Sequence, residues 1–237
     1  MKKFFVKILL LTGLVSTSFN SSASDFSVTS LSLFNFNNNS LISQLYDGLD
    51  LGEFGLERDA LDRAIKGYES LVEKGIVRNA QYLTVIDFSQ PLVNRRFYLI
   101  DVENQELVLN TFVMHGKNSG SEMAEKFSNK LNSNQSSLGF YVTKQSYNGS
   151  RGYSLRLAGL EKEFNSNAEA RGVVLHGSQY INEQRASAGK VERSLGCPAI
   201  PQSENLDVIN RIKEGSLLFI YYPDEKYLQR SQVLNEL

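Results

Sequence analysis

The thiol of one cysteine is the most reactive side chain in this sequence, and the residues around it favour a reactive role over a structural one. Cys197 is the only cysteine among 237 residues, and the N-terminus reads as an export signal. A lone thiol in an oxidising compartment cannot form an internal disulfide, so it is buried and inert, bonded to another molecule, or kept for its reactivity. Gly196 lets the backbone turn tightly behind the thiol, and Pro198 removes an N–H that a strand would use. We therefore expect reactivity rather than the more usual buried, inert cysteine.

The second reactive group is an imidazole upstream of the thiol. His176 ends the apolar run 173–175 and precedes a polar loop, 178–193. A neutral imidazole can accept the proton of a thiol, and the resulting imidazolium stabilises the thiolate. A cysteine with a histidine is the minimal equipment for cysteine acyl transfer. A histidine at a strand end usually serves packing, but beside this cysteine we expect His176 to be the general base and Cys197 the nucleophile.

Acyl transfer passes through an oxyanion, which backbone N–H groups beside the cysteine can stabilise. Leu195, Gly196 and Cys197 supply consecutive N–H groups. A cluster of this kind stabilises a tetrahedral intermediate by roughly 3 kcal/mol per donor. Ser194 opens the same segment, and we expect it to contact the substrate.

The other histidine of the chain stands in a similar setting. His115 follows a strand-like run and precedes a glycine, as His176 does. It is a candidate for a substrate contact, a second pocket residue or the base itself, and a purely structural role is equally open. Two histidines and a cysteine can also bind Zn²⁺, but closely spaced ligands such as His-x-x-x-His are missing. We expect no metal and no cofactor.

Arginines flank the thiol and the imidazole in the sequence, at Arg171, Arg185 and Arg193. The planar pair of donors on arginine suits a substrate carboxylate, although any one surface arginine is more often a solvated charge. Arg171, just before the strand that carries His176, is the candidate substrate contact.

The first 23 residues have the three parts of a secretory signal peptide. Three lysines give a basic start, residues 8–15 supply a short apolar run, and Ala23 ends a small-residue cleavage site. The apolar run is shorter than the ~20 residues that span a bilayer. We expect export to the periplasm or cell envelope, with no integral membrane segment after signal cleavage. Retention of the signal as an N-terminal anchor stays open.

The charge of the mature chain argues against one class of partner. Removing the 3 lysines of the signal from 25 basic residues leaves 22, against 26 acidic residues, a net charge near −4. Nucleic acids select basic surfaces, and so do anionic lipids. We expect no nucleic acid as a partner, and the oligomeric state stays unknown.

Hydrophobic periodicity predicts helices first and strands after them. Apolar residues recur at the helical period from Leu56 to Val72, with Gly75 as a stop, and a short helix is expected over 41–46. A late helix is expected between a cap at Ser203 and a stop at Gly215. Short β-branched or aromatic segments predict strands at 82–88, 96–102, 107–114, 138–144, 153–157, 172–176 and 216–222.

These elements indicate an α+β fold, a mostly antiparallel β-sandwich-like domain with a helical N-terminal extension. A hydrophobic content of 41% fits a globular chain. The predicted organisation has five parts: a signal peptide (1–23), a Ser/Asn-rich lead-in (24–40), the helical extension (41–78), the domain with the thiol and imidazole (79–223) and a C-terminal tail (224–237).

The motifs around the two reactive residues resemble those of the L,D-transpeptidase (YkuD-type) catalytic domain, and most closely the murein L,D-transpeptidase subgroup. The shared pieces are 114–120, 127–129, 136–141, the His-Gly of 171–177 and the Ser-x-Gly-Cys-Pro of 194–198. They span about residues 80–222. Two positions differ from the usual family pattern: Leu195 stands where histidine is common, and Pro198 begins a stretch where arginine often follows.

The resemblance implies acyl transfer on peptidoglycan stem peptides. Cys197 would attack the carbonyl of the third stem residue and expel the terminal D-alanine, with His176 as base and the carbonyl of Gly177 orienting the imidazole. An amine would complete an L,D-transpeptidase reaction, and water an L,D-carboxypeptidase reaction. Two other readings stay open: a non-catalytic wall-binding envelope protein on the same fold, and a zinc-dependent hydrolase.

Overall fold

The computed structural model describes residues 38–235, so the predicted signal peptide and nearly all of the predicted lead-in lie outside the described residues. The helices are α1 (Asn38–Tyr46), α2 (Arg58–Glu73), α3 (Glu183–Ser187), α4 (Asn205–Ile212), α5 (Glu225–Arg230) and α6 (Gln232–Asn235). The strands are β1 (Tyr82–Asp87), β2 (Phe97–Asp101), β3 (Glu106–Thr111), β4 (Gly139–Gly149), β5 (Gly152–Gly159), β6 (Val174–Ser178), β7 (Ala199–Pro201) and β8 (Leu217–Tyr221). The predicted strands match all of these except β7, and α3, α5 and α6 have no predicted counterpart.

The strands form one mixed sheet in the order β3-β2-β1-β8-β4-β5-β6-β7. Strands β1 and β8 pair in parallel, as do β6 and β7, and the other neighbours are antiparallel. The α+β class is therefore confirmed, but the expected antiparallel sandwich is not, because the sheet is single and mixed. Parallel neighbours need long crossover connections, and short strand patterns alone do not reveal which connections cross over.

One of these crossovers delivers the cysteine. Strand β6 carries His176 and pairs in parallel with β7, with His176 opposite Ala199. The chain must therefore return from the end of β6 to the start of β7, and residues 179–198 make this return, with α3 inside them. Cys197 lies at the end of the crossover. The parallel pairing thus brings the thiol to the strand next to the imidazole.

A short bridge closes the sheet almost into a barrel. The sheet order begins with β3 and ends with β7. Met114, three residues beyond the end of β3, forms an antiparallel bridge to Ala199 in β7, and its N–H donates to the Ala199 carbonyl at 2.8 Å. The two outer strands of the sheet are therefore connected through the segment that leads to His115.

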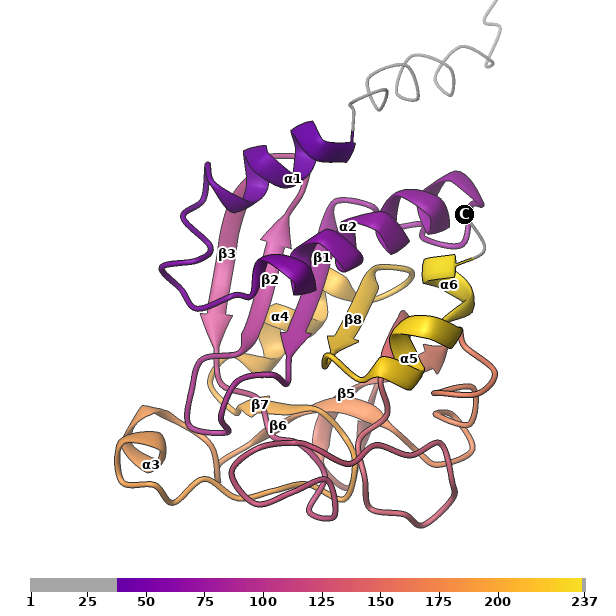
Figure 1. Ribbon diagram of the computed structural model, residues 1–237. Coiled ribbons are helices and arrows are strands. Elements are labelled where there is room, and N and C mark those ends of the chain that lie inside the picture. The colour runs from indigo at the N-terminus through magenta and orange to yellow at the C-terminus, as the bar shows by residue number, and fades with distance from the viewer. Residues whose placement is uncertain (1–37, 236–237) are drawn as a thin grey trace, which may run out of the picture. The chain divides into compact units, whose positions relative to one another are not determined.

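Helix α2 packs across the sheet, as Figure 1 shows, and belongs to the same core. Its buried stripe includes Leu61, Ile65 and Tyr68, which share one hydrophobic cluster with Phe140 and Phe219 of the sheet. The predicted helix is present, but it does not form a separate N-terminal extension. A single stripe of this kind must be covered, and here the central strands cover it.

The segment expected as a C-terminal tail folds onto the domain. Helices α5 and α6 bury Tyr227, Val233 and Leu234 in the main cluster. Buried Glu161 joins this segment to the sheet, because its carboxylate accepts bonds from the Tyr227 hydroxyl (3.1 Å), the Ser231 hydroxyl and the Phe140 amide (2.9 Å). Burial raises the pKa of Glu161, and these hydrogen bonds oppose the rise.

The expected cap of helix α4 is wrong. Glu204 occupies the N-cap position, with no side-chain bond to the helix, and Ser203 lies one residue before it. The predicted stop is close to the observed end, since Gly215 adopts φ of 115° shortly after the last helical residue, Ile212.

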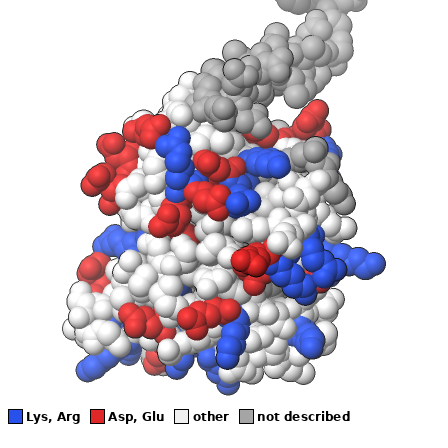
Figure 2. All heavy atoms as spheres, in the orientation of Figure 1, with Lys and Arg blue, Asp and Glu red and all other residues white. Residues whose placement is uncertain are grey.

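Among residues 38–235 no helix is both long and apolar enough to cross a membrane. Acidic and basic side chains are interspersed over the face seen in Figure 2. This mixture agrees with the small formal net charge of −1 for the whole chain.

Candidate active site

Cys197 is half-buried and lies two residues before β7. Its Sγ lies 3.7 Å from the carbonyl oxygen of Gly172, to which the thiol donates. Burial raises the pKa of the thiol, while a backbone bond from Val174 and the charges of Arg151 and Arg171 lower it. The rise prevails, so the thiol is protonated at neutral pH in the absence of substrate.

A tight turn over residues 194–197, called the cysteine turn below, carries this thiol. The Ser194 hydroxyl donates to the Cys197 carbonyl at 2.6 Å and accepts from the Gly196 N–H at 3.0 Å. Gly196 has φ of 122°, and a Cβ there would come within 2.9 Å of the Gln135 carbonyl oxygen. Only glycine fits both constraints. The hydroxyl of Ser194 is therefore used to shape the turn rather than held out toward a substrate.

The turn is anchored from outside by the segment 114–117. The Ser194 N–H donates to the His115 carbonyl at 2.9 Å, and the Lys117 N–H donates to the Ser194 carbonyl at 2.8 Å. Together with the bridge from Met114 to Ala199, these bonds hold the cysteine turn at both of its ends.

His115 lies under this anchor and is fully buried. Arg96 donates to its Nδ1 at 2.8 Å, so Nδ1 is the acceptor and Nε2 donates to the Gly120 carbonyl at 3.2 Å. Burial and the Arg96 charge lower the pKa of His115 to about 4. With both ring nitrogens bonded inside the protein, His115 does not fit the expected role of substrate contact; it supports the anchor.

Arg96 is itself fully buried, and among residues 38–235 no carboxylate lies within hydrogen-bond reach of it. Its guanidinium donates to the carbonyls of Gln90 (2.8 Å) and Val113 (3.0 Å) and lies 4.6 Å from the centre of the Phe88 ring. Burial lowers its pKa to about 9, which leaves it charged at neutral pH. Arg96 is thus a buried cation that holds the ring of His115, and the backbone of His115 in turn bonds to Ser194 in the cysteine turn.

His176 is buried on β6, with its ring oriented by a neighbouring carbonyl. Its Nδ1 lies 2.9 Å from the Gly177 oxygen. A carbonyl can only accept, so Nδ1 carries the proton and Nε2 holds the lone pair. The backbone N–H of His176 donates to the Pro198 carbonyl at 3.4 Å, one residue beyond the cysteine. Burial lowers the pKa of His176, the Gly177 bond opposes this, and Arg151 lowers it further.

The backbone groups expected to form an oxyanion site do not all remain available. The Gly196 N–H is bonded to Ser194, and the contact that Gly177 makes with the imidazole is through its carbonyl. The N–H groups of Leu195 and Cys197 have no acceptor within the described part of the chain. These two donors, with Leu195 exposed, are the ones left for a developing oxyanion.

Arg171 reaches the cysteine turn but is not a free clamp. Its guanidinium donates to the carbonyls of Ser128 (2.6 Å) and Gln135 (2.5 Å) and to the hydroxyls of Ser133 (3.1 Å) and Ser137. One of its terminal nitrogens would lie 3.3 Å from a Cβ on Gly196. Arg171 therefore ties the 128–137 loop to the turn and adds positive charge near the thiol.

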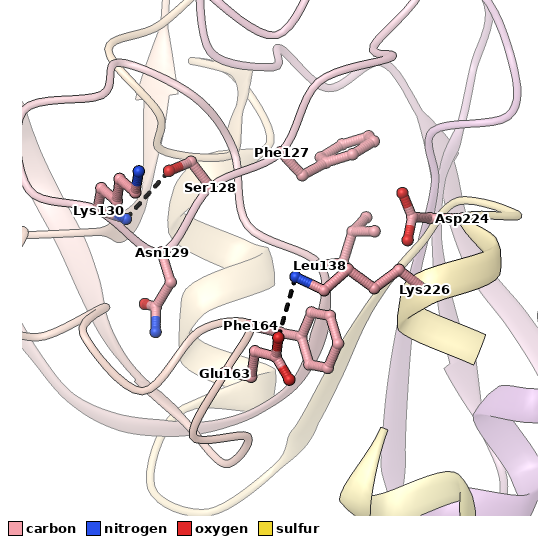
Figure 3. Close-up of a pocket in the computed structure, with 9 residues that line it drawn as sticks. All are labelled: Phe127, Ser128, Asn129, Lys130, Leu138, Glu163, Phe164, Asp224 and Lys226. Carbon is pink, nitrogen blue, oxygen red and sulfur yellow. Dashed lines mark hydrogen bonds and ion pairs between the residues drawn. The ribbon is translucent and has the colours of Figure 1, made fainter. Parts of the chain in front are cut away.

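A well-formed cavity lies elsewhere, between the loop 127–130, Glu163 with Phe164, and the start of α5 (Figure 3). Its volume is about 260 Å³, and an ion pair of 2.9 Å joins Lys226 to Glu163 at its edge. Neither Cys197 nor His176 lines it. The cavity and the thiol are thus different places on the molecule.

The two histidines and the cysteine do not assemble around one point. Within residues 38–235, no three His, Cys, Asp or Glu side chains are grouped as a metal site would require. His115 is bonded to Arg96 and Gly120, which leaves neither ring nitrogen for a zinc ion. The structure therefore gives no support to the zinc-dependent reading.

This chain matches the sequence profile of a known protein family. The sequence profile of the L,D-transpeptidase catalytic domain matches residues 53–221, a range that includes α2, the whole sheet, His176 and Cys197. This chain belongs to the L,D-transpeptidase catalytic domain family. Members of this family are enzymes that act on peptidoglycan stem peptides.

Solved L,D-transpeptidase structures resemble the chain only distantly. One from Mycobacterium smegmatis is 12% identical over 60% of this chain and 59% of its own, with a TM-score of 0.38. L,D-transpeptidase 3 from Mycobacterium tuberculosis is also 12% identical, over 60% of this chain and 61% of its own, with a TM-score of 0.38. The chain thus spans about 60% of the length of these two structures. No curated protein gives a significant match, and the assignment rests on the family profile.

In this L,D-transpeptidase domain, sequence reasoning missed two arginines that matter. Arg96 stands in a strand-like run and gave no sign that it would be buried. Arg151 sits between two glycines in a hairpin turn, yet its charge acts on both Cys197 and His176. The spacing Gly149-Ser150-Arg151-Gly152 predicts a tight hairpin, but only the pairing of β5 with β6 shows that the strand after this hairpin runs beside His176.

Proposed function

We propose that this protein is an exported cysteine acyltransferase that acts on peptidoglycan stem peptides, with Cys197 as nucleophile and His176 as general base. The observation that supports it most is the parallel pairing of β6 and β7, because His176 lies on β6 opposite Ala199 and Cys197 comes two residues before Ala199. The bond from His176 to the Gly177 carbonyl adds to this, because it holds the lone pair at Nε2.

The pKa shifts define the protonation state from which the reaction starts. Burial raises the pKa of Cys197 and lowers that of His176. Both groups are therefore neutral at pH 7, as a thiol and an imidazole rather than an ion pair. Proton transfer to Nε2 then accompanies attack, as general base catalysis requires.

In the acylation step, Sγ of Cys197 bonds to the carbonyl carbon of the third stem residue. The thiol proton passes to Nε2 of His176, and the carbonyl oxygen becomes an oxyanion beside the N–H groups of Leu195 and Cys197. The C–N bond to the terminal D-alanine then breaks, and the imidazolium returns the proton to the leaving amine. A thioester on Cys197 and free D-alanine result.

The second step resolves the thioester. An amine from another stem gives a crosslink, which is transpeptidation, and water gives a trimmed tripeptide stem, which is carboxypeptidation. In either case His176 takes a proton from the incoming nucleophile and returns it to the cysteine sulfur. The two outcomes differ only in which nucleophile reaches the acyl group.

Treatment of isolated cell walls with the purified protein tests this function. After digestion, mass spectrometry should find new crosslinks between third-position residues, or tetrapeptide stems shortened by one alanine. Cys197→Ala should leave the muropeptides unchanged, and Ser187→Ala, at an exposed position in α3, should act like the wild type. Unchanged muropeptides with the wild-type protein would instead favour the non-catalytic wall-binding role.

Export is tested separately. We expect the protein recovered from the envelope fraction to begin at Ser24, as N-terminal sequencing would show. A chain that still begins at Met1 and stays with the membrane would instead indicate a retained N-terminal anchor.

A further inference from the structure

The back of the strand that carries the imidazole is covered by side chains at the start of helix α4. Gly177 follows His176 in β6, and successive residues of a strand face opposite sides of the sheet. A Cβ on Gly177 would lie 2.6 Å from Oε1 of Gln202 and 2.9 Å from Cβ of Asn205. These two side chains therefore fill the space behind Gly177, and the side chain of His176 leaves β6 on the opposite face.

Asn205, the first residue of α4, joins this helix to the neighbouring strand β5. It is 1% exposed, and its Nδ2 donates to the carbonyl of Tyr153 at 2.7 Å. The next residue of β5, Ser154, lies directly opposite His176 in the sheet. The amide of Asn205 thus fixes the start of α4 against β5 at the level of the imidazole.

The orientation of this buried amide is set by the carbonyl of Tyr153. The Oδ1 of Asn205 is buried, and within residues 38–235 no donor reaches it. Turning the amide over would place two oxygens face to face, because a carbonyl can only accept. An unpaired buried acceptor costs free energy. The favourable contributions of Asn205 are therefore its donated bond and its close packing against Gly177.

We propose that Asn205 is a positioning residue for His176 and acts through Gly177. By holding the start of α4 against β5 and against the back of Gly177, it keeps the Gly177 carbonyl where Nδ1–H of the imidazole donates to it, at 2.9 Å. The lone pair then stays at Nε2, where a general base needs it. This inference rests on the proposed function, because only a catalytic base gives the choice of tautomer a role in turnover.

The tautomers of the two histidines of this chain can be read directly by NMR, because protonated and unprotonated ring nitrogens differ in chemical shift. Both imidazoles are neutral at pH 7, since burial lowers the pKa of each. We expect the Nδ1–H form for His176 and the Nε2–H form for His115, whose Nδ1 accepts from Arg96. In Asn205→Ala, His176 should become a mixture of both forms, while the signals of His115 stay unchanged.

Asn210→Ala is the matched control. Asn210 also lies in α4 and accepts a bond from Tyr153, but from its side-chain hydroxyl, at 2.9 Å. Its removal loosens the same helix on the same residue without touching the Tyr153 carbonyl or Gly177. Asn210→Ala should therefore keep the wild-type tautomer. An equal shift in both variants would overturn the inference, since any loosening of α4 would then be enough.

Asn205→Ser covers the case in which Asn205→Ala does not fold, which the His115 signals report. The shorter serine side chain still carries a donor but reaches the Tyr153 carbonyl less well, so His176 should show a detectable fraction of the Nε2–H form. A tautomer unchanged from the wild type in every folded Asn205 variant would overturn the inference. So would the Nε2–H form of His176 in the wild type itself.

Turnover separates this inference from the proposed function. With a tetrapeptide donor, Asn205→Ala should lower kcat about 10-fold, because the base is held less precisely, and leave KM nearly unchanged. Asn210→Ala should match the wild type. A shifted tautomer in a protein that processes no stem peptide would count against the proposed function alone. A shifted tautomer with an unchanged kcat would overturn the positioning role of Asn205 in an active enzyme.

Discussion

At the scale of single residues, Arg96 and His115 explain how the cysteine turn is held without direct contact to the thiol. Arg96 donates to Nδ1 of His115, and the His115 carbonyl accepts from Ser194 at the start of the turn. Protonation of His115 would put two buried cations 2.8 Å apart and remove the acceptor. The hydrogen bond from Arg96 to His115 therefore requires a neutral imidazole.

This requirement makes folding stability depend on pH. His115 has a pKa of about 4 in the folded protein, against an ordinary value of 6.5, so below pH 6.5 the unfolded chain binds the extra proton first. Stability should fall as the pH decreases from about 6.5 to 4, by about 3 kcal/mol from this residue. Urea unfolding at several pH values measures the slope, which His115→Gln should reduce because glutamine can accept and donate without titrating. Equal slopes in both proteins would contradict this role.

At the scale of elements, the crossover from β6 to β7 ends in a turn that one hydroxyl shapes. Ser194→Ala removes two hydrogen bonds, to Cys197 and from Gly196. We expect kcat to fall about 10-fold or more, because a small misplacement of a reacting atom has large effects, with a stability loss of about 1–3 kcal/mol. Steady-state kinetics and thermal unfolding measure both. A normal kcat would show that the turn keeps its geometry without the serine.

Helix α2 provides a second element-scale prediction. Gly67 faces the sheet, and a Cβ there would lie 2.3 Å from the Phe140 ring. Alanine normally stabilises a helix interior relative to glycine by about 1 kcal/mol, but overpacking costs about 1–3 kcal/mol. Gly67→Ala should therefore destabilise the protein in chemical unfolding, while Lys66→Ala, at the exposed neighbouring position, should be nearly neutral. A gain in stability for Gly67→Ala would mean that α2 packs more loosely on the sheet.

At the scale of the whole molecule, the C-terminal helices and the sheet share one hydrophobic core. Glu161→Ala would leave the Phe140 amide and the Tyr227 and Ser231 hydroxyls without their buried acceptor. We expect a loss of about 3 kcal/mol or more in the free energy of unfolding. Glu163→Ala is the control, because its ion pairs with Lys226 and Arg230 are exposed and are worth about 1 kcal/mol at most. Similar losses in both variants would contradict the buried role of Glu161.

The sequence predicts those parts of the fold that depend on local pattern. The stripe of α2 and the segments that became β1, β2 and β8 are readable because each buries its own apolar residues. The thiol, the imidazole and the Gly177 carbonyl are also readable, because they lie in short contiguous motifs. The parallel partners of β6 and β8 are not, since pairing depends on contacts between distant segments. The same reason hides the burial of Arg96 and the commitment of Arg171 to the 128–137 loop.

The most direct test of the central claim is to trap the acyl-enzyme. The purified protein is mixed with a tetrapeptide donor in the absence of an acceptor amine, quenched in acid, and its intact mass is measured. We predict an increase equal to the tripeptide acyl group, located on Cys197 by peptide mapping, with no such increase in Cys197→Ser. Release of D-alanine by Cys197→Ser at the wild-type rate, or an adduct on another residue, would contradict the account.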